Sequence, residues 1–153
     1  MKKKLVGLLM AVSMCMGTFS MATPALANTT DRTIDFDVNA LNYNVTTGSA
    51  KKDGKTPVYV YLTSLASRDS MYVRALGVAN SKSYNMTENG TTGSLTDHVT
   101  CKQGTQYSVH SQIYEKGYGY AKVAFKSKNA INSERAVGKW SPDSTKTYTH
   151  AWQ

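Results

Sequence analysis

The sequence predicts an all-β fold, a single antiparallel β-sandwich domain that follows an N-terminal signal helix. No segment after residue 27 repeats apolar residues at helical spacing. The segments there are short and rich in Tyr, Val, Thr and Ser, and Gly, Asn and Asp interrupt them at short intervals. Short strand-forming segments divided by turn residues are typical of sandwiches and barrels.

The first 27 residues are typical of a secretory signal peptide. Three lysines precede an apolar run over residues 5–16, and Ala25 and Ala27 form an A-x-A cleavage site. A positive start, a short apolar core and a small-residue exit are what an export signal needs, and the run is too short to span a bilayer stably. We expect cleavage before Asn28 and a mature domain of residues 28–153, secreted or associated with the cell wall.

The composition of the mature part sets its size, redox chemistry and charge. Its 126 residues suit one domain with one core. Cys101 is then the only cysteine, so no disulfide within the chain is expected, and a buried small hydrophobe is its expected role. Three of the 18 basic residues leave with the signal, and 15 remain against 10 acidic ones, a net charge of +5. A basic exported protein favours anionic surfaces, although ordinary solubility is an alternative reason for this charge.

The first mature strand shows a half-buried alternation. Ile34, Phe36 and Val38 alternate with Asp35 and Asp37, which predicts an apolar face and a solvated face. The alternation restarts out of phase over residues 41–45, which predicts a bulge or bend at residues 39–40.

The next elements follow from turn residues and apolar runs. Pro57 is allowed only at the start of a central strand, and the run that follows it is apolar or aromatic on both faces. The remaining segments are predicted as a basic connection at 47–56, a central strand at 58–65, a strand at 71–79, a loop at 84–94 and a strand at 97–101.

Residues 105–127 predict a β-hairpin. A three-residue loop with Gly117 in the left-handed conformation would join the two strands. If Tyr114 faces Tyr118, Val109 pairs with Val123, and one register separates an apolar face from a polar and aromatic face.

The polar face of this hairpin is the candidate ligand site. Tyrosine offers an apolar plate with a hydroxyl and lysine offers charge, which together suit sugar rings that bear anionic groups. The alternative is that another segment covers this face or that it is simply solvated. The candidate residues are His110, Gln112, Tyr114, Tyr118, Tyr120, Lys122 and Lys126.

The sequence offers no catalytic or metal-binding motif. His98 and Cys101 are three residues apart in a predicted strand, so their side chains point to opposite faces. The spacings of His, Cys and Asp match no metal motif, and no glycine loop suits a phosphate. We therefore expect no enzyme activity, no catalytic residue, no metal, no cofactor and no nucleic-acid partner, and the sequence leaves the oligomeric state open.

Three segments resemble a group of small secreted proteins of Gram-positive bacteria that is classed as a domain of unknown function. They are residues 56–60 (TPVYV), 113–118 (IYEKGY) and 138–144 (GKWSPDS). The resemblance implies an exported β domain and carries no catalytic residues. Independently, Trp140 before Ser-Pro-Asp predicts a buried aromatic side chain that anchors a last strand before a turn.

A second resemblance is to secreted antibacterial proteins of the lactococcin 972 type. It depends on residues 135–140 (RAVGKW) and on the aromatic residues Tyr148 and Trp152. Those proteins are small cationic β-sandwiches that interfere with cell-wall synthesis. Two functions are therefore expected: binding of anionic cell-wall polymer or glycan by a secreted, non-enzymatic domain, or, as the alternative, a bacteriocin-like activity against other cells.

Overall fold

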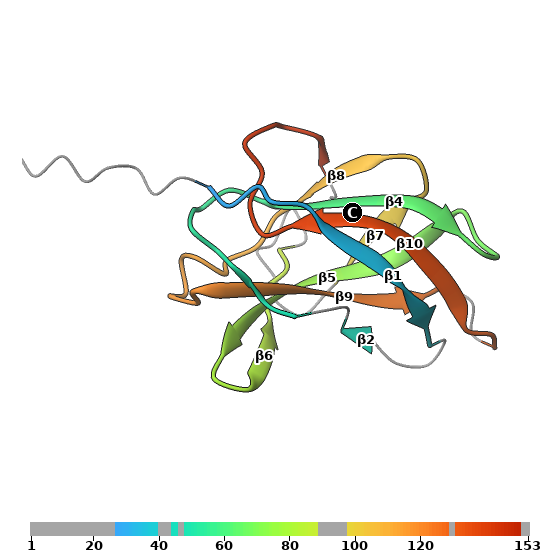
Figure 1. Ribbon diagram of the computed structural model, residues 1–153, viewed down its shortest axis with the longest axis horizontal. Coiled ribbons are helices and arrows are strands. Elements are labelled where there is room, and N and C mark those ends of the chain that lie inside the picture. The colour runs from blue at the N-terminus through green and yellow to red at the C-terminus, as the bar shows by residue number, and fades with distance from the viewer. Residues whose placement is uncertain (1–26, 40–43, 46–47, 89–97, 129–130, 151–153) are drawn as a thin grey trace, which may run out of the picture.

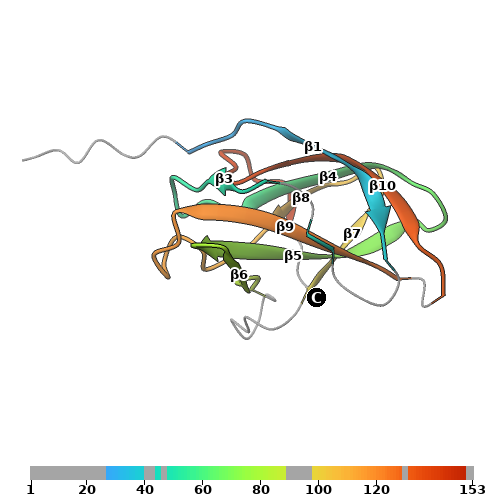
Figure 2. The same cartoon turned by 60° about the horizontal axis from the view of Figure 1, so that its bottom comes forward.

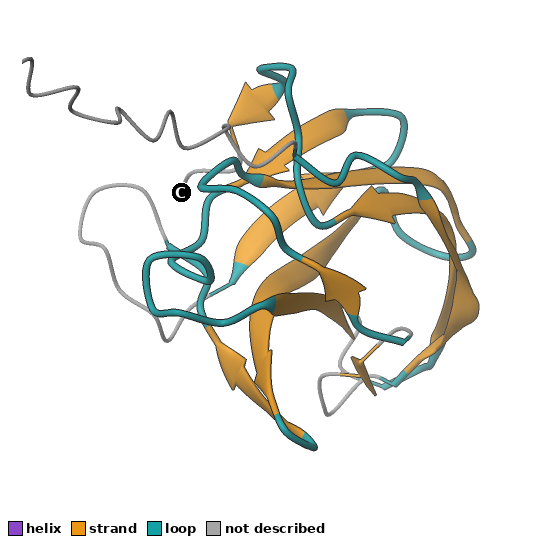
Figure 3. Cartoon of the chain, turned by 60° about the vertical axis from the view of Figure 1, so that its left-hand side comes forward, coloured by secondary structure: helices purple, strands orange, loops and turns teal. Residues whose placement is uncertain are grey.

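The computed structural model describes residues 27–39, 44–45, 48–88, 98–128 and 131–150. Within these ranges the chain forms β-strands and no helix (Figure 3). The predicted signal helix lies outside the described residues. The strands are β1 (Arg32–Val38), β2 (Asn44–Val45), β3 (Ala50–Lys51), β4 (Val58–Leu65), β5 (Ser70–Ala79), β6 (Lys82–Asn85), β7 (Val99–Lys102), β8 (Gln106–Val109), β9 (Tyr120–Ser127), β10 (Glu134–Ser141) and β11 (Thr149–His150).

The strands form two sheets that lie one above the other. A five-stranded sheet has the order β1-β10-β4-β8-β11, and a six-stranded sheet has the order β2-β9-β5-β6, with β3 paired to β9 and β7 to β5. Every pairing is antiparallel except that of β11 with β8, which is parallel. Figure 1 labels these elements, and Figure 2 shows β1, β10 and β4 in one layer above β9 and β5 in the other.

The core lies between the two sheets and draws on both. Trp140 and Ile34 of the five-stranded sheet are fully buried, as are Val73 and Phe125 of the six-stranded sheet. The ring of Phe36 meets that of Phe125 edge to face, with centroids 5.7 Å apart, so the contact joins β1 to β9. Burying apolar surface from both layers is what holds the sheets face to face.

Several predictions for single strands are confirmed. Ile34 and Val38 are buried and Asp35 and Asp37 are exposed, as the alternation in β1 requires. β4 lies between β10 and β8, which makes it the central strand of its sheet. Trp140 is fully buried near the end of β10, and Cys101 is a free, fully buried thiol.

The pairing of β10 contains a register shift. It falls between Val137 and Gly138 where β10 pairs with β4. A Cβ atom on Gly138 would lie 2.1 Å from the carbonyl oxygen of Tyr61, so only glycine fits this close backbone approach. The bulge predicted at residues 39–40 involves Ala40, which lies outside the described residues.

The predicted hairpin over residues 105–127 is wrong, although the left-handed conformation predicted for Gly117 is confirmed. Gly117 has a φ of +79°, and its N–H donates to the carbonyl oxygen of Tyr114 at 2.9 Å. The flanking strands, however, lie in different sheets: β8 pairs with β4 and β11, and β9 pairs with β5, β2 and β3.

The segment that follows β8 carries the chain from one sheet to the other. The N–H of Gln112 donates to the carbonyl of Met86 at 2.9 Å, and the N–H of Glu88 donates to the carbonyl of His110 at 3.0 Å. These bonds tie residues 110–112 to the segment that follows β6. The backbone groups that would continue a hairpin are therefore used in a crossover.

Candidate functional site

The seven predicted ligand-face residues do not share one face. Tyr120, Lys122 and Lys126 lie on β9, whereas His110 and Gln112 lie in the crossover after β8. Tyr114 and Tyr118 belong to the turn before β9. The predicted face was derived from a β8–β9 pairing that does not exist, so its residues divide among three places.

Tyr118 covers part of the six-stranded sheet. A Cβ atom on Gly77 would lie 2.7 Å from the Tyr118 ring, so the ring rests directly on the glycine backbone. The Tyr118 ring also lies beside that of Tyr84, with centroids 5.7 Å apart. Tyr118 is therefore a packing residue at the end of the core.

The outer face of the six-stranded sheet brings cations and aromatic rings together. In β5 and β9 the inward positions, such as Val73 and Phe125, are fully buried, so the alternate positions face outward. We call this surface the basic face. It consists of Tyr72, Arg74, His98, Tyr120, Lys122, Lys126 and Lys128.

The rings and cations of the basic face contact one another. The ring of His98 lies 4.0 Å from that of Tyr72, centroid to centroid. The ammonium of Lys128 lies 5.3 Å from the centre of the same Tyr72 ring, within the range of a cation–π interaction. Tyr120, 49% exposed, pairs with Val78 at the other end of β5.

Several positively charged side chains lie on the basic face, and no carboxylate occupies the described strand positions between them. Arg74 lies on β5, and Lys122, Lys126 and Lys128 lie along β9 and just beyond it, with Ala124 at the outward position between the first two. Residues two apart on a strand are roughly 6.5 Å apart, so this is a row of charges. None of the described outward positions of β5, β6, β7 and β9 is Asp or Glu.

On the outer face of the five-stranded sheet, cations contact carboxylates. Arg135 of β10 pairs with Asp35 of β1 at 2.7 Å, and Lys139 lies 3.7 Å from Asp31. Asp37 is also exposed beside Arg135. Two of the cations on this sheet, Arg135 and Lys139, are therefore paired with carboxylates of the N-terminal segment.

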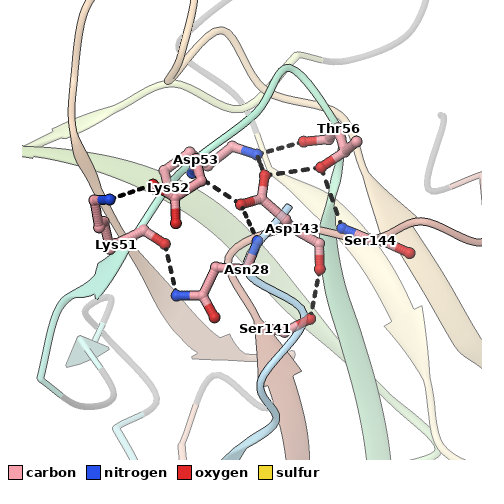
Figure 4. Close-up of polar contacts among 8 residues, drawn as sticks. All are labelled: Asn28, Lys51, Lys52, Asp53, Thr56, Ser141, Asp143 and Ser144. Atoms are coloured by element: carbon pink, nitrogen blue, oxygen red, sulfur yellow. Dashed lines mark hydrogen bonds and ion pairs between the residues drawn. The ribbon is translucent and has the colours of Figure 1, made fainter. Parts of the chain in front are cut away.

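A second polar site, which we call the Asp143 cluster, lies where β10 ends (Figure 4). The side chains of Asp143 and Lys52 form an ion pair with 0% and 1% of their surface exposed. The hydroxyl of Thr56 donates to Asp143 Oδ1 at 2.8 Å, and the N–H of Asp53 donates to Oδ2 at 2.9 Å. The N–H of Asn28 donates to the same Oδ2 at 3.0 Å.

The protonation of the Asp143 cluster follows from burial and hydrogen bonding. Burial lowers the pKa of Lys52, and the bond to Asp143 offsets this only in part. Burial disfavours the charged form of Asp143, but the bonds from Lys52, Asp53 and Thr56 outweigh it and hold the pKa of Asp143 below its usual value. The sequence analysis did not identify this cluster, because Lys52 lies in a lysine-rich connection and its partner Asp143 is 91 positions away.

A small cavity of about 190 Å³ adjoins the Asp143 cluster. The rings of Tyr59 and Tyr148 meet at its wall with centroids 4.9 Å apart. Burial raises the pKa of Tyr59 to about 12, so its phenol stays protonated at neutral pH. The lining residues are Thr29, Asp31, Tyr59, Ser141, Asp143, Ser144, Thr145, Lys146 and Tyr148.

His98 and Cys101 face opposite sides of the six-stranded sheet, as predicted. Cys101 is fully buried in the core and burial raises the pKa of its thiol, whereas His98 stacks on Tyr72. In the part of the chain that the structure describes, no group of three or more His, Cys, Asp and Glu side chains could hold a metal ion.

No helix among the described residues is long and apolar enough to cross a membrane.

The comparisons with known proteins give a family for this chain. No curated protein and no solved structure matches it, and the resemblance to lactococcin 972-type proteins finds no support in them. A family model described as "Protein of unknown function (DUF2712)" matches residues 19–144, which include both the basic face and the Asp143 cluster. This confirms the resemblance to a domain of unknown function, and the chain belongs to the DUF2712 family.

Proposed function

We propose that this protein is a secreted, non-enzymatic β-sandwich that binds anionic polymers of the cell envelope through the basic face. The observation that carries the proposal is the row formed by Lys122, Lys126 and Lys128 beside Arg74, on a face whose described strand positions hold no carboxylate. A row of like charges attracts a polyanion at long range and holds it at several points.

The aromatic side chains of the basic face support a glycan or glycan-linked polymer as the ligand. Tyr120, 49% exposed, offers a ring face and a hydroxyl at one end of the lysine row. Sugar rings stack on such faces while their anionic groups meet the lysines. The export signal predicted over residues 1–27 would bring the domain to these polymers.

The test compares two triple variants that lose the same charge from opposite sides. Lys122→Gln/Lys126→Gln/Lys128→Gln removes the three lysines of the basic face, and Arg135→Gln/Lys139→Gln/Lys146→Gln removes three charges elsewhere. Retention of each purified protein is measured on Gram-positive cell walls, with walls stripped of their anionic polymers as the blank.

We expect the first triple variant to bind about tenfold more weakly or worse, since each cation near an anionic surface contributes about 1 kcal/mol. The second variant should change binding about threefold or less, and about 0.5 M NaCl should release the parent protein, because the Debye length there is roughly 4 Å. Equal losses in both variants, or retention that ignores salt, would contradict the proposal. Growth inhibition of related strains by the parent protein would favour the bacteriocin-like alternative.

A further inference from the structure

Asn28 follows the predicted cleavage site, and both its backbone N–H and its backbone carbonyl form hydrogen bonds with Asp143. Its N–H donates to Asp143 Oδ2 at 3.0 Å (Figure 4). Its carbonyl accepts from the N–H of Asp143 at 3.2 Å. Asn28 lies 115 positions from Asp143 in the sequence, so the fold brings the two together.

The side chain of Asn28 fixes the same position. Its Nδ2 donates to the carbonyl of Lys51 at 3.0 Å, and its Oδ1 accepts from the N–H of Thr30 at 3.3 Å. Four hydrogen bonds therefore hold the residue at which the mature chain is expected to begin. A chain end without such ties is ordinarily mobile.

The acceptor for the Asn28 nitrogen is a buried carboxylate. Asp143 exposes none of its side chain, and its Oδ2 also accepts from the N–H of Asp53. A peptide N–H offers this oxygen one neutral donor. Cleavage between Ala27 and Asn28 turns the same nitrogen into an ammonium with a positive charge and three donors, which forms a stronger, charge-assisted bond.

We propose that Asp143 is the binding site for the α-ammonium that signal cleavage creates at Asn28, so that cleavage itself stabilises the exported domain. This inference rests on the export and cleavage included in the proposed function. The uncleaved chain makes only the neutral contact, and the mature chain gains an ion pair inside the Asp143 cluster.

The charges around the site accommodate one more cation. Lys52 shares Asp143, Lys51 pairs with Asp53 at 2.7 Å, and Glu115 acts on Lys52 at longer range. Asp31 and Lys146 line the adjoining cavity together with the phenols of Tyr59 and Tyr148. The lysines named here number three and the carboxylates four, so the new ammonium brings these groups to balance.

The experiment compares two chains that differ by two residues. One begins at Asn28 and is released from a fusion by a protease that leaves no extra residue, and the other keeps Leu26 and Ala27. Urea unfolding is measured for both at about pH 6.5, below the ordinary α-amine pKa of about 7.7 to 8.0, and again at about pH 10.5. Lys52 shares Asp143 with the new ammonium, so a third chain that begins at an acetylated Asn28 controls for the titration of the groups that all chains share.

At the lower pH we expect the folded-to-unfolded ratio of the Asn28 chain to be about tenfold larger. The carboxylate raises the ammonium pKa in the folded state, so the advantage is complete below the unfolded-state pKa and is lost as pH rises through the folded-state value. Acetylation of Asn28 keeps the N–H but removes the charge, and it should abolish the advantage. Equal stability of free, acetylated and extended chains at both pH values would overturn the inference.

The two proposals fail in different ways. Mass measurement of the secreted protein should give a chain that begins at Asn28, and any other first residue overturns the processing inference while leaving retention on cell walls untouched. A chain that gains stability from its free terminus but does not bind cell walls removes only the proposed function.

Discussion

Lys52 and Asp143 form an ion pair that is closed to water. Their side chains expose 1% and 0% of their surface, and Thr56 supplies further bonds to both: its hydroxyl donates to Asp143 and its carbonyl accepts from Lys52. Removing two charges from water costs several kcal/mol per ion, so such a pair holds only when each partner is satisfied. The pair fixes the position of the segment before β4 against the end of β10.

Asp143→Asn should destabilise the domain by about 3 to 5 kcal/mol, because it leaves the Lys52 ammonium buried without its counter-charge. Urea unfolding at neutral pH measures the loss. Asp143→Asn/Lys52→Met removes both charges and should recover a large part of it, since the two residues act as one unit.

The matched control for this cycle is an exposed pair. Lys139→Met breaks the contact with Asp31, in which both side chains are about half exposed, and should cost less than about 1 kcal/mol. If Asp143→Asn costs no more than Lys139→Met, the Asp143 cluster is not a stabilising centre.

The chemistry of the Asp143 cluster could not be predicted from local sequence. Lys51 and Lys52 are adjacent in a basic connection, yet the first is exposed and the second is buried. The difference arises from Asp143, which lies 91 positions away. Composition predicts that lysines are solvated, and only the tertiary partner reverses that for one of them.

At the scale of elements, the sequence predicted strands better than their partners. The strands β8 and β9 and the left-handed Gly117 between them are local properties, and the structure has all three. The partner of a strand is not local. Tyr107 and Val109 share one core with Val123 and Phe125, which come from the opposite sheet. The same side chains would also share one apolar face if β8 and β9 were neighbours in one sheet. The apolar pattern therefore fits both arrangements.

Engineered disulfides distinguish these two arrangements. Tyr61→Cys/Gln106→Cys joins direct partners on β4 and β8, and the pair should oxidise to a disulfide without unfolding the domain. Gln106→Cys/Lys126→Cys joins residues that would face each other in the predicted hairpin but lie in different sheets, and it should stay reduced. Thiol counting of each folded protein in mild oxidant measures the outcome.

Cys101 does not confuse this measurement. Its thiol is fully buried, and burial raises its pKa, so it reacts slowly in the folded state. A disulfide in the Gln106/Lys126 pair together with a reduced Tyr61/Gln106 pair would refute the pairing of β4 with β8.

At the scale of the whole molecule, the sequence predicted the fold class and the amount of charge but not its distribution. The all-β class followed from short segments and frequent turn residues, and both sheets consist of such segments. The net charge of +5 was countable. The position of each charge depends on which strands are neighbours. Lysines gather on one face of the six-stranded sheet, whereas ion pairs such as Arg135–Asp35 form on the five-stranded sheet. For that reason the residues predicted to share one ligand face lie in three places, and only Tyr120, Lys122 and Lys126 remain together on β9.

The stability of the whole domain should fall in acid, and Asp143 sets the direction. Its pKa is held below the usual value in the folded state, so its contribution is present above the unfolded value of about 3.9 and is lost as pH falls through the folded value. Protonation of the other carboxylates leaves the cations of both faces to repel one another. Urea midpoints measured from about pH 7 to about pH 3 should therefore decrease.

The control is Asp143→Asn/Lys52→Met, whose midpoint should fall less over the same range, because the ion pair is already absent. An equal loss in this variant would assign the acid sensitivity to the surface charges alone. Added salt would then restore the midpoint of both proteins alike, because salt screens exposed charges far more than buried ones.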